Sequence, residues 1–292
     1  MILYKQIERN KRNTVFIVAG FVLFVLAVGA SLTYLTAGDY YSGMILAGII
    51  GGIYTIMMLL SSTNVVMKMN HAKHIKSKND DPFLWNTVEN LAMAARIPMP
   101  QIYIINDNSP NAFATGTSPQ KGAVAVTTGL MRRLNREEIE GVLAHEVAHI
   151  RNFDIRLATI AIALVSAVAI LSDLGARLMF FSRGNRNKQQ HPAVLILALL
   201  LLVLAPIVAT LIRLAISRNR EYLADASAVE LTRNPLALAS ALRKITAIDA
   251  PVQEASSTSA PLYFADPLKK KVTNLFSTHP IPQERIKRLE LM

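Results

Sequence analysis

The chain of 292 residues contains no cysteine, and this absence excludes a disulfide framework, thiolate catalysis and any metal site built on sulfur. Charged residues are also scarce, at 17%, where an ordinary soluble protein has about 25%. Hydrophobic residues make up 52%, a composition that disordered, collagen-like and coiled-coil chains do not have. Any metal bound here must therefore be held by His, Asp or Glu.

Acidic residues are fewer than basic ones, with 20 Asp and Glu against 31 Lys and Arg, which gives a formal net charge of +11 at pH 7. In a soluble chain this excess would first suggest nucleic-acid binding. The mean hydropathy of +0.32 favours an anionic membrane surface instead, because such a surface suits cations that flank apolar spans. We therefore expect a lipid bilayer, and no nucleic acid, as a partner.

Four apolar stretches are candidates for membrane helices, which need about 20 apolar residues. Residues 14–35 and 41–60 carry no charge and predict an N-terminal transmembrane hairpin within residues 1–62. A cleavable signal peptide is the alternative for the first stretch, but its apolar run is longer than a signal core. The stretches 155–181 and 192–212 lie within a second helical region, residues 155–216, which either spans the membrane or dips into it.

The distribution of cations predicts which side of the membrane each segment faces. Lys5, Arg9, Lys11 and Arg12 precede the first stretch, and four lysines follow the second, whereas the loop between them carries only Asp39. The positive-inside rule therefore places both ends of the hairpin in the cytoplasm of a bacterial cell. The cations at residues 183–188 do not suit an outside loop, so the sequence leaves open whether the second pair fully crosses.

Two polar regions, residues 63–154 and 217–292, predict one cytoplasmic α+β domain that is mostly helical. Apolar periodicity predicts a helix over residues 82–96. Short β-rich runs at residues 102–105, Ala112–Thr115 and Ala123–Thr127, separated by turn-forming residues, predict a small sheet. The second region is expected to be helical, with a loop at residues 250–261.

The sequence HEVAH at residues 145–149 is the strongest chemical signal in the chain. Asn135 and Glu138 predict the capped start of a helix, on which His145 and His149 lie one turn apart on one face. Two imidazoles at this spacing can bind one metal ion, while Glu146 lies where it can act as a general base. Alternatively, the two histidines are merely structural.

A third ligand is expected from residues 218–230, where Glu221 and Asp225 are again four residues apart. A glutamate ligand completes a His, His, Glu set, and Asp225 is placed to accept the ring N–H of a ligand histidine. The alternative is a solvated helix start in which these carboxylates only pair with Arg218 and Arg220. If His149 and Glu221 bind one ion, the intervening chain must return to the side of the membrane that it left.

Three separated motifs together resemble the HtpX family of membrane zinc metalloproteases, which are gluzincins related to the CaaX prenyl proteases. They are HEVAH, then SRNREYLADASA at residues 217–228, then STHPIPQER at residues 277–285, and the resemblance covers essentially the whole chain. It implies that His145, His149 and Glu221 bind one zinc ion and that Glu146 is the base. It also implies that His279 and Arg285 lie in the active site and stabilise the oxyanion.

The family resemblance extends to Asn111, Ala112, Phe113 and Ala114, which resemble an edge strand that binds the backbone of a substrate. The implied function is proteolytic quality control of misfolded or damaged membrane proteins under stress, with unfolded polypeptides as partners. Two alternatives stay open: a zinc protease for lipidated or terminal peptides, and a non-catalytic membrane scaffold. The sequence does not indicate an oligomeric state.

Overall fold

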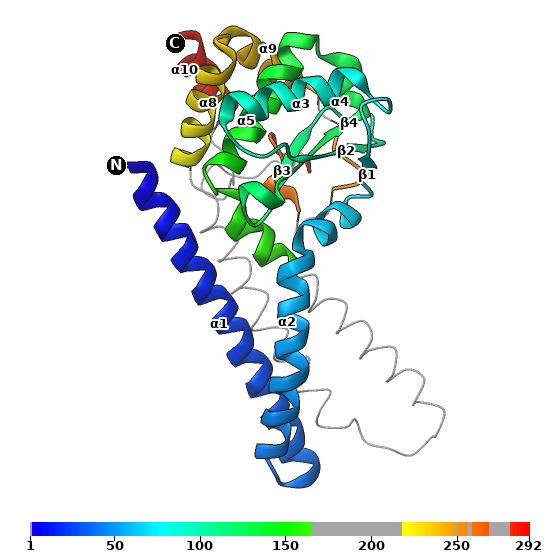
Figure 1. Cartoon of the computed structure of the whole chain (residues 1–292), viewed down its shortest axis with the longest axis vertical. Helices are drawn as coiled ribbons and strands as arrows, with labels where there is room; N and C mark the ends of the chain where they lie inside the picture. The colour runs from blue at the N-terminus through cyan, green and yellow to red at the C-terminus, as the bar shows by residue number, and fades with distance from the viewer. Residues whose placement is uncertain (1, 165–217, 249, 256–258, 269–280) are drawn as a thin grey trace.

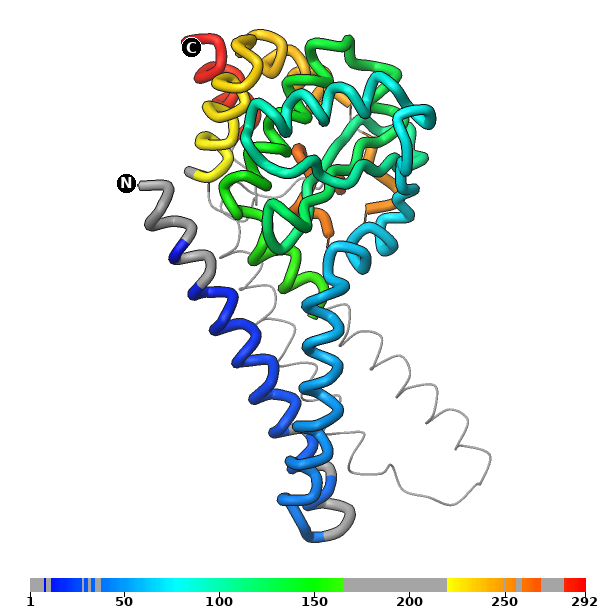
Figure 2. The backbone as a smooth tube through the Cα atoms, viewed as in Figure 1, coloured from blue at the N-terminus to red at the C-terminus, as the bar shows by residue number. Residues whose placement is uncertain are grey.

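The computed structural model describes residues 2–164, 218–248, 250–255, 259–268 and 281–292. Helices α1 (Ile2–Ala37) and α2 (Tyr41–Met69) form a long hairpin that projects from a head of helices and strands (Figures 1 and 2). The Asp39 carboxylate stabilises the turn by accepting hydrogen bonds from the backbone N–H groups of Tyr41 (2.9 Å) and Ser42 (3.2 Å). The two helices approach closely at Gly29 and Gly43, where a Cβ on Gly43 would lie 2.2 Å from the Gly29 carbonyl oxygen.

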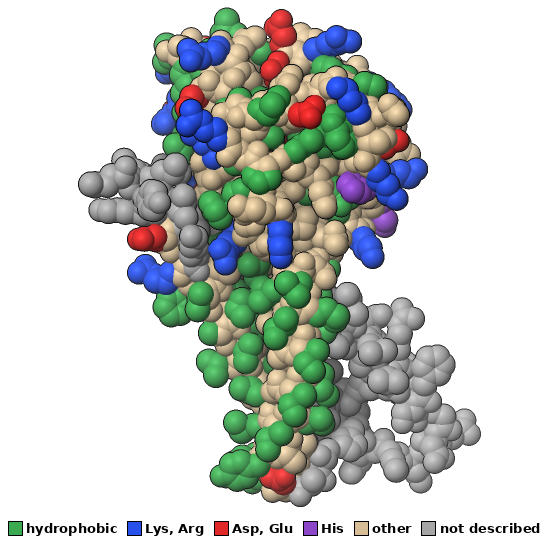
Figure 3. Space-filling model, in the orientation of Figure 1, with side chains coloured by type: hydrophobic (Ala, Val, Ile, Leu, Met, Phe, Trp, Pro, Cys, Tyr) green, Lys and Arg blue, Asp and Glu red, His purple; other side chains and the backbone are tan. Residues whose placement is uncertain are grey.

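Large apolar side chains cover the outer surface of the hairpin (Figure 3). Among the described helices, α2 alone is long and apolar enough to cross a bilayer, and two shorter apolar segments are Arg12–Ala27 and Ile155–Leu164. A row of α2 side chains is 57–65% exposed: Ile45, Leu46, Ile49, Ile50, Ile53, Ile56 and Leu60. Contiguous exposed apolar side chains of this kind are typical of surfaces that contact a membrane or another protein. Most of the expected stretch 155–181 and all of 192–212 lie outside the described residues.

Four strands form one mixed sheet in the order β1-β2-β4-β3. The strands are β1 (Lys73–Ile75), β2 (Gln101–Ile105), β3 (Ala112–Thr115) and β4 (Ala123–Thr127). β2 and β4 run parallel, whereas β1 pairs with β2 and β3 pairs with β4 in antiparallel fashion. β3 is therefore the last strand of the sheet, on the side away from β1.

The helices of the head are α3 (Pro82–Ala95), α4 (Thr128–Arg133), α5 (Arg136–Arg151), α8 (Arg218–Thr232), α9 (Pro235–Ala247) and α10 (Pro282–Glu290). Single 3₁₀ turns occupy Pro119–Lys121 and Ala260–Leu262. α3 begins where the Asp81 side chain accepts a hydrogen bond from the Leu84 N–H, and it ends at Arg96, whose φ of 55° is left-handed. Such a residue stops a helix, because its N–H turns back to the last carbonyls.

The side chains of the sheet alternate between two apolar cores, as the pleat of a strand requires. On one face, Val124 and Val126 of β4 pack with buried residues of α3, α5 and α9. On the other face, Phe113 of β3 packs with Val66 and Met67 at the end of α2. The second core therefore fastens the hairpin directly to the sheet.

The structure confirms a mostly helical head with a small sheet. The expected strand at residues 102–105 begins one residue earlier, and the expected helix at 82–96 ends one residue earlier, at the left-handed Arg96. The strand β1 and the short helix α4 were not expected. The three-residue β1 has mostly exposed side chains and no apolar alternation, so only its pairing with β2 reveals it.

Candidate metal centre

Helix α5 presents two imidazoles on one buried face. It begins with a capping box, in which Asn135 and Glu138 each accept a hydrogen bond of 2.8 Å from the other's backbone N–H. The side chain of His145 is 1% exposed and that of His149 is 12% exposed. Their Nε2 atoms lie 3.1 Å apart. The helix itself therefore brings two ligand nitrogens together.

Glu221 reaches the same point from α8, which packs along α5 (Figure 1). Its Oε1 lies 3.5 Å from His149 Nε2, and its Oε2 lies 3.7 Å from His145 Nε2. One ligand atom from each of the three residues can be chosen so that all lie within 4.8 Å of one another. The structure thus brings Glu221 to the HEVAH helix, although residues 155–216 separate the two elements.

The three residues fit a small tetrahedral ion. Four ligands about 2.1 Å from a central ion lie about 3.4 Å apart in a tetrahedron. The two Nε2 atoms lie 3.1 Å apart, one Glu221 oxygen lies 3.5 Å from His149 Nε2 and the other lies 3.7 Å from His145 Nε2, so each imidazole has a carboxylate oxygen near that spacing. Three protein ligands leave one tetrahedral position for water or substrate, which is the arrangement of catalytic rather than structural sites.

The electrostatic environment also favours a cation between these side chains. Burial by itself lowers the pKa of His149, but hydrogen bonds to Asp154 and Glu221 outweigh it and raise that pKa to about 10. The carboxylates therefore favour positive charge at this point, whether a proton or a metal ion supplies it. A bound ion would replace the proton on the ligand nitrogen.

A carboxylate stands behind each imidazole. Asp225 Oδ1 lies 2.9 Å from His145 Nδ1, and Asp154 Oδ2 lies 3.3 Å from His149 Nδ1. Each pair keeps a ring proton on Nδ1, so Nε2 is the nitrogen at which a metal ion would replace a proton. Carboxylates in this position fix the orientation of ligand histidines and raise their basicity.

Arg285 of α10 organises the two carboxylates of α8. It donates to both oxygens of Asp225, through Nε at 2.8 Å and Nη2 at 2.6 Å, and its Nη1 lies 3.4 Å from Glu221 Oε2. Burial would lower the pKa of Arg285, but Asp225 raises it above its usual value. Burial disfavours the charged form of Asp225 as well and would raise its pKa, but Arg285 and His145 lower that pKa to about 2. The Arg285–Asp225 pair therefore remains ionised at neutral pH.

Glu146 lies beside the imidazoles and is 1% exposed. Its Oε2 has no hydrogen-bond partner within the described part of the chain. Burial raises the pKa of this carboxyl group, while His145 and His149 favour its charged form. A buried, unpaired carboxylate oxygen is costly unless a bound group satisfies it, so the atom indicates a place for water or substrate.

The residues expected to bind substrate lie on or next to β3. Ala112, Phe113 and Ala114 form the strand and are at most 1% exposed, and Asn111 precedes it with a buried side chain. The Asn111 Nδ2 donates a hydrogen bond of 2.9 Å to the Ala265 carbonyl oxygen. His279, the remaining residue expected in the site, lies outside the described residues.

Two residues near the centre were not anticipated. Asp154 follows the end of α5, and its position depends on Phe153, whose φ of 59° turns the chain back so that the Asp154 N–H donates to the His149 carbonyl oxygen at 3.1 Å. Nothing in the sequence predicts that a phenylalanine adopts the left-handed backbone conformation. The Phe264 ring meets the His145 ring edge-on, with centroids 5.0 Å apart, and this contact joins parts of the chain that periodicity cannot relate.

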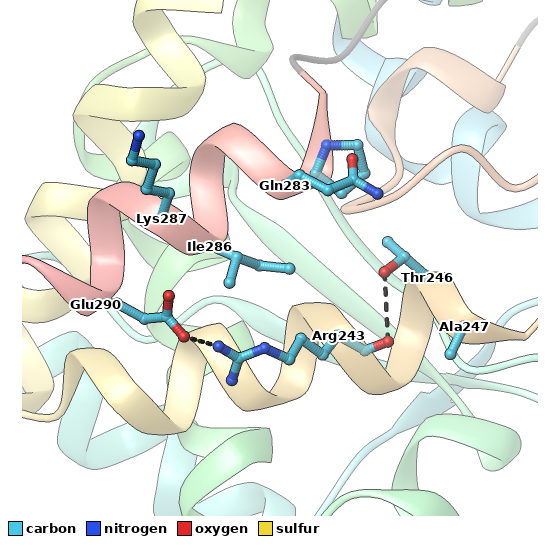
Figure 4. A pocket seen from close by; sticks show the side chains of 8 residues that line it. Arg243, Thr246, Ala247, Gln283, Ile286, Lys287 and Glu290 are labelled. Carbon is cyan, nitrogen blue, oxygen red and sulfur yellow. Dashed lines mark hydrogen bonds and ion pairs between the residues drawn. The ribbon is translucent and has the colours of Figure 1, made fainter.

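An open groove between α9 and α10 lies apart from these residues (Figure 4). Arg243 of α9 and Glu290 of α10 form an ion pair there, and Ile286 lies between the two helices. The contact holds one side of α10 against α9. Arg285, the residue next to Ile286, points instead to the carboxylates of α8, so this junction determines where the guanidinium lies.

Comparison with known proteins gives a consistent result. The model of the family described as Peptidase family M48 matches residues 78–292. A Protease HtpX homolog of Listeria monocytogenes serotype 4b (strain CLIP80459) is 54% identical, and those of Leuconostoc citreum (strain KM20) and Ligilactobacillus salivarius (strain UCC118) are 49% and 48% identical, each over 100% of both chains. The match to the crystal structure of S. mikatae Ste24p has 19% sequence identity and a TM-score of 0.49, and it covers 99% of this chain and 66% of the Ste24p chain.

Proposed function

This chain belongs to peptidase family M48, among the HtpX proteases, and on that basis we propose that it is a zinc-dependent endopeptidase of the bacterial plasma membrane. Membership of the family makes it a metalloprotease, which hydrolyses peptide bonds. The observation that carries the rest of the proposal is the convergence of His145, His149 and Glu221 from two helices on one point.

Zinc is the proposed ion, one per chain. Two imidazole nitrogens and a carboxylate with one open position are a ligand set that zinc hydrolases use. The absence of cysteine leaves no thiolate ligand that would favour an iron–sulfur cluster. Asp225 and Asp154 support the choice, because each holds a ligand imidazole with Nε2 facing the centre.

The proposed chemistry divides between the ion and the protein. When bound, zinc supplies Lewis acidity toward the peptide carbonyl and lowers the pKa of water. Glu146 accepts a proton from the attacking water at its unpaired Oε2 and delivers it to the leaving amine nitrogen. Its raised pKa suits both steps, because a base works best when its pKa is near the working pH.

Arg285 and His279 are proposed to bind the carbonyl oxygen on which negative charge develops. Support for Arg285 comes from its Nη1, which lies 3.3 Å from a backbone carbonyl oxygen of the chain itself, that of Phe264. Its Nε and Nη2 are held by Asp225, so the guanidinium is oriented before a substrate arrives. Oriented donors of this kind commonly contribute the largest part of transition-state stabilisation.

The substrates are proposed to be misfolded or damaged membrane proteins, cleaved on the cytoplasmic side. A strand edge such as that of β3 binds an extended backbone, and folded proteins offer few such segments. The cations that flank the hairpin support the cytoplasmic placement. The exposed apolar surface of α2 supports residence in the bilayer, where such substrates are found.

The test compares the purified full-length protein with its Glu146→Gln and Glu140→Gln variants. Glu140 lies on the exposed side of the same helix, so it provides the matched control for the loss of one carboxylate. Cleavage of unfolded casein and the zinc content per chain are measured for each protein. We expect stoichiometric zinc in all three, activity in wild type and Glu140→Gln, and a loss of at least 10³-fold in Glu146→Gln, on the order of a lost catalytic group.

Each other outcome has a defined meaning. Equal cleavage by wild type and Glu146→Gln would overturn the catalytic assignment and favour a scaffold. Stoichiometric binding of a different metal in the active protein would overturn zinc. Cleavage restricted to peptide ends or to lipidated peptides would favour the more specialised protease.

A further inference from the structure

The outer edge of β3 is paired with another part of the chain. Phe113 forms an isolated antiparallel bridge with Tyr263. The Phe264 N–H donates a hydrogen bond of 2.8 Å to the Ala112 carbonyl oxygen. We call residues 259–265, which contain this pairing, the strap segment. It follows the edge of the sheet in the antiparallel direction, as an added strand would.

The Asn111 side chain extends this pairing by one residue. Its Nδ2 donates 2.9 Å to the Ala265 carbonyl oxygen, and its Oδ1 accepts a hydrogen bond of 3.3 Å from the Ala265 N–H. The Asn111 side chain therefore binds both backbone groups of one residue of the strap segment. Contacts of this kind recognise an extended backbone rather than a particular side chain.

The strap segment also touches the proposed catalytic groups. Arg285 Nη1 donates to the Phe264 carbonyl oxygen at 3.3 Å, and its guanidinium lies 4.8 Å from the centroid of the Phe264 ring. The same ring meets His145 edge-on, with centroids 5.0 Å apart. Phe264 thus has its N–H bound by the edge strand, its carbonyl oxygen by a cation, and its ring by a ligand imidazole.

We propose that residues 263–265 are an internal substrate mimic, and that the site accepts extended peptides with an aromatic side chain at the position of Phe264 and a small one at that of Ala265. This inference rests on the proposed function of β3 as the substrate-binding strand. Three groups that a peptide bound along β3 would use are already engaged: the Ala112 carbonyl, the Asn111 side-chain amide and Arg285. A substrate therefore binds only when the strap segment has left the edge.

The strap segment is hydrogen-bonded to a buried residue at the end of the membrane hairpin, and we call this contact, between Asn70, Ser259 and Tyr263, the latch. Asn70, the residue after α2, is fully buried, and its Oδ1 accepts hydrogen bonds from the Ser259 hydroxyl (2.7 Å) and the Tyr263 hydroxyl (3.1 Å). Its Nδ2 donates to the Val66 carbonyl oxygen at 2.8 Å. The position of α2 and the position of the strap segment are therefore coupled through one side chain.

Competition by an attached segment has a kinetic signature. A tethered segment acts as a competitor at high effective concentration, so it reduces the fraction of protein that can bind substrate. It does not alter the complex once substrate has bound. Loosening the strap segment is therefore expected to lower KM and leave kcat unchanged, whereas damage to a structural support would lower kcat or stability.

The first experiment removes one oxygen atom, and with it one of the hydrogen bonds that join the strap segment to Asn70. Tyr263→Phe removes the hydroxyl that donates to Asn70 and keeps the ring, and Tyr34→Phe makes the same change at an exposed position of α1. Full-length proteins in detergent are assayed on unfolded casein, with zinc content and melting temperature as checks on folding. We expect a three- to tenfold lower KM and unchanged kcat for Tyr263→Phe alone. An unchanged or higher KM would contradict the proposal that Asn70 holds the strap segment on the edge of β3.

The second experiment supplies the mimic in trans. A capped peptide with the sequence of residues 260–266, APLYFAD, is added to wild type and to Tyr263→Phe, beside a peptide with alanine in place of the phenylalanine. We expect competitive inhibition, at least tenfold weaker for the alanine peptide and stronger for Tyr263→Phe than for wild type. Absent competition, or equal inhibition by the two peptides, would overturn the mimic.

The Glu146→Gln variant separates this inference from the function beneath it. Equal cleavage by Glu146→Gln and wild type means that the proposed function has failed. An inactive Glu146→Gln variant, together with a peptide that does not compete, means that the site is catalytic and that the strap segment is a permanent part of the fold.

Discussion

Asp225 and Asp154 stand behind the two imidazoles, but they are held in different ways. Asp225 is one turn from Glu221 on α8, so the sequence pattern predicts that both share a face. Arg285 donates hydrogen bonds to both carboxylate oxygens of Asp225. Asp154 owes its position to the left-handed turn at Phe153, which precedes it. The residue types and spacing therefore predicted one supporting carboxylate, whereas the other depends on a backbone conformation that most residues avoid.

Asp154→Asn is expected to weaken metal binding about tenfold, at the low end for such supporting residues. The amide oxygen still accepts the His149 ring N–H, but it lacks the charge that makes the opposite nitrogen a stronger ligand. Affinity is measured by competition with a chromogenic zinc chelator at fixed pH. Glu140→Gln, on the exposed side of α5, serves as the control and should bind as wild type does. Equal affinities in all three proteins would contradict the role given to Asp154.

At the scale of elements, the start of α5 shows how local sequence and tertiary contacts combine. The capping box was predictable from Asn135 and Glu138 alone. The structure adds that Ser240 and Lys244 of α9 also donate to Glu138, at 2.6 and 2.8 Å. Burial alone would raise the pKa of Glu138, but these hydrogen bonds, with that of Asn135, lower it below its ordinary 4.5.

Glu138→Gln is therefore expected to destabilise the head at pH 7 by about 1–2 kcal/mol, the usual worth of a capping and charged hydrogen bond. Because the folded pKa is depressed, the stabilisation is complete above the ordinary pKa and is lost as the pH falls through the lowered value. Melting temperatures of wild type and variant should then converge in acid. Glu140→Gln should track wild type throughout, and a gap that persists at low pH would contradict the charge-based explanation.

The crossing of α1 and α2 allows a test with a matched substitution. A Cβ on Gly43 would lie 2.0 Å from the Thr33 Oγ1 and 2.2 Å from the Gly29 carbonyl oxygen, whereas one on Gly52 would meet nothing within 4 Å. Gly43→Ala is expected to force the helices apart and lower the melting temperature in detergent by several degrees, since overpacking costs about 1–3 kcal/mol. Gly52→Ala on the same helix should be neutral or slightly stabilising. Similar melting temperatures for the two would contradict a close crossing.

The sheet shows where prediction from sequence ends. The apolar runs of β2, β3 and β4 are visible as strands, because β-branched and small apolar residues are bounded by turn formers. Their order is not visible, since a parallel pair such as β2 and β4 is joined through space while β3 lies between them in sequence. The position of β3 at the edge, on which the proposed substrate binding depends, is therefore a property of the fold.

At the scale of the whole molecule, the hairpin was predictable, but its attachment to the head was not. The uncharged runs at residues 14–35 and 41–60 predict two helices of membrane-spanning length, and of the described helices α2 meets that criterion. Val66 and Met67 contact the sheet, and Asn70 contacts Ser259 and Tyr263, which lie almost 200 positions further along the chain. Only the packed structure relates them.

The cysteine-free sequence makes the orientation of the molecule directly measurable. Tyr40→Cys at the hairpin turn and Lys78→Cys beside the head each introduce a unique thiol at an exposed position. A membrane-impermeant maleimide should label Tyr40→Cys in intact cells, and Lys78→Cys only after permeabilisation, because cations flank the head side of the hairpin. Unmodified wild type controls for background. Labelling in the reverse pattern would place the metal centre outside the cell.

The order of the parts along the chain controls when the centre is complete. His145 and Arg285 lie 140 positions apart, so the guanidinium leaves the ribosome long after the HEVAH helix does. At about 5–20 residues per second, the delay amounts to roughly 7–28 s of translation. During that interval a nascent copy holds its histidines without the arginine that orients their partners. The contacts that orient Asp225 and Glu221 can therefore form only after residue 285 has been synthesised.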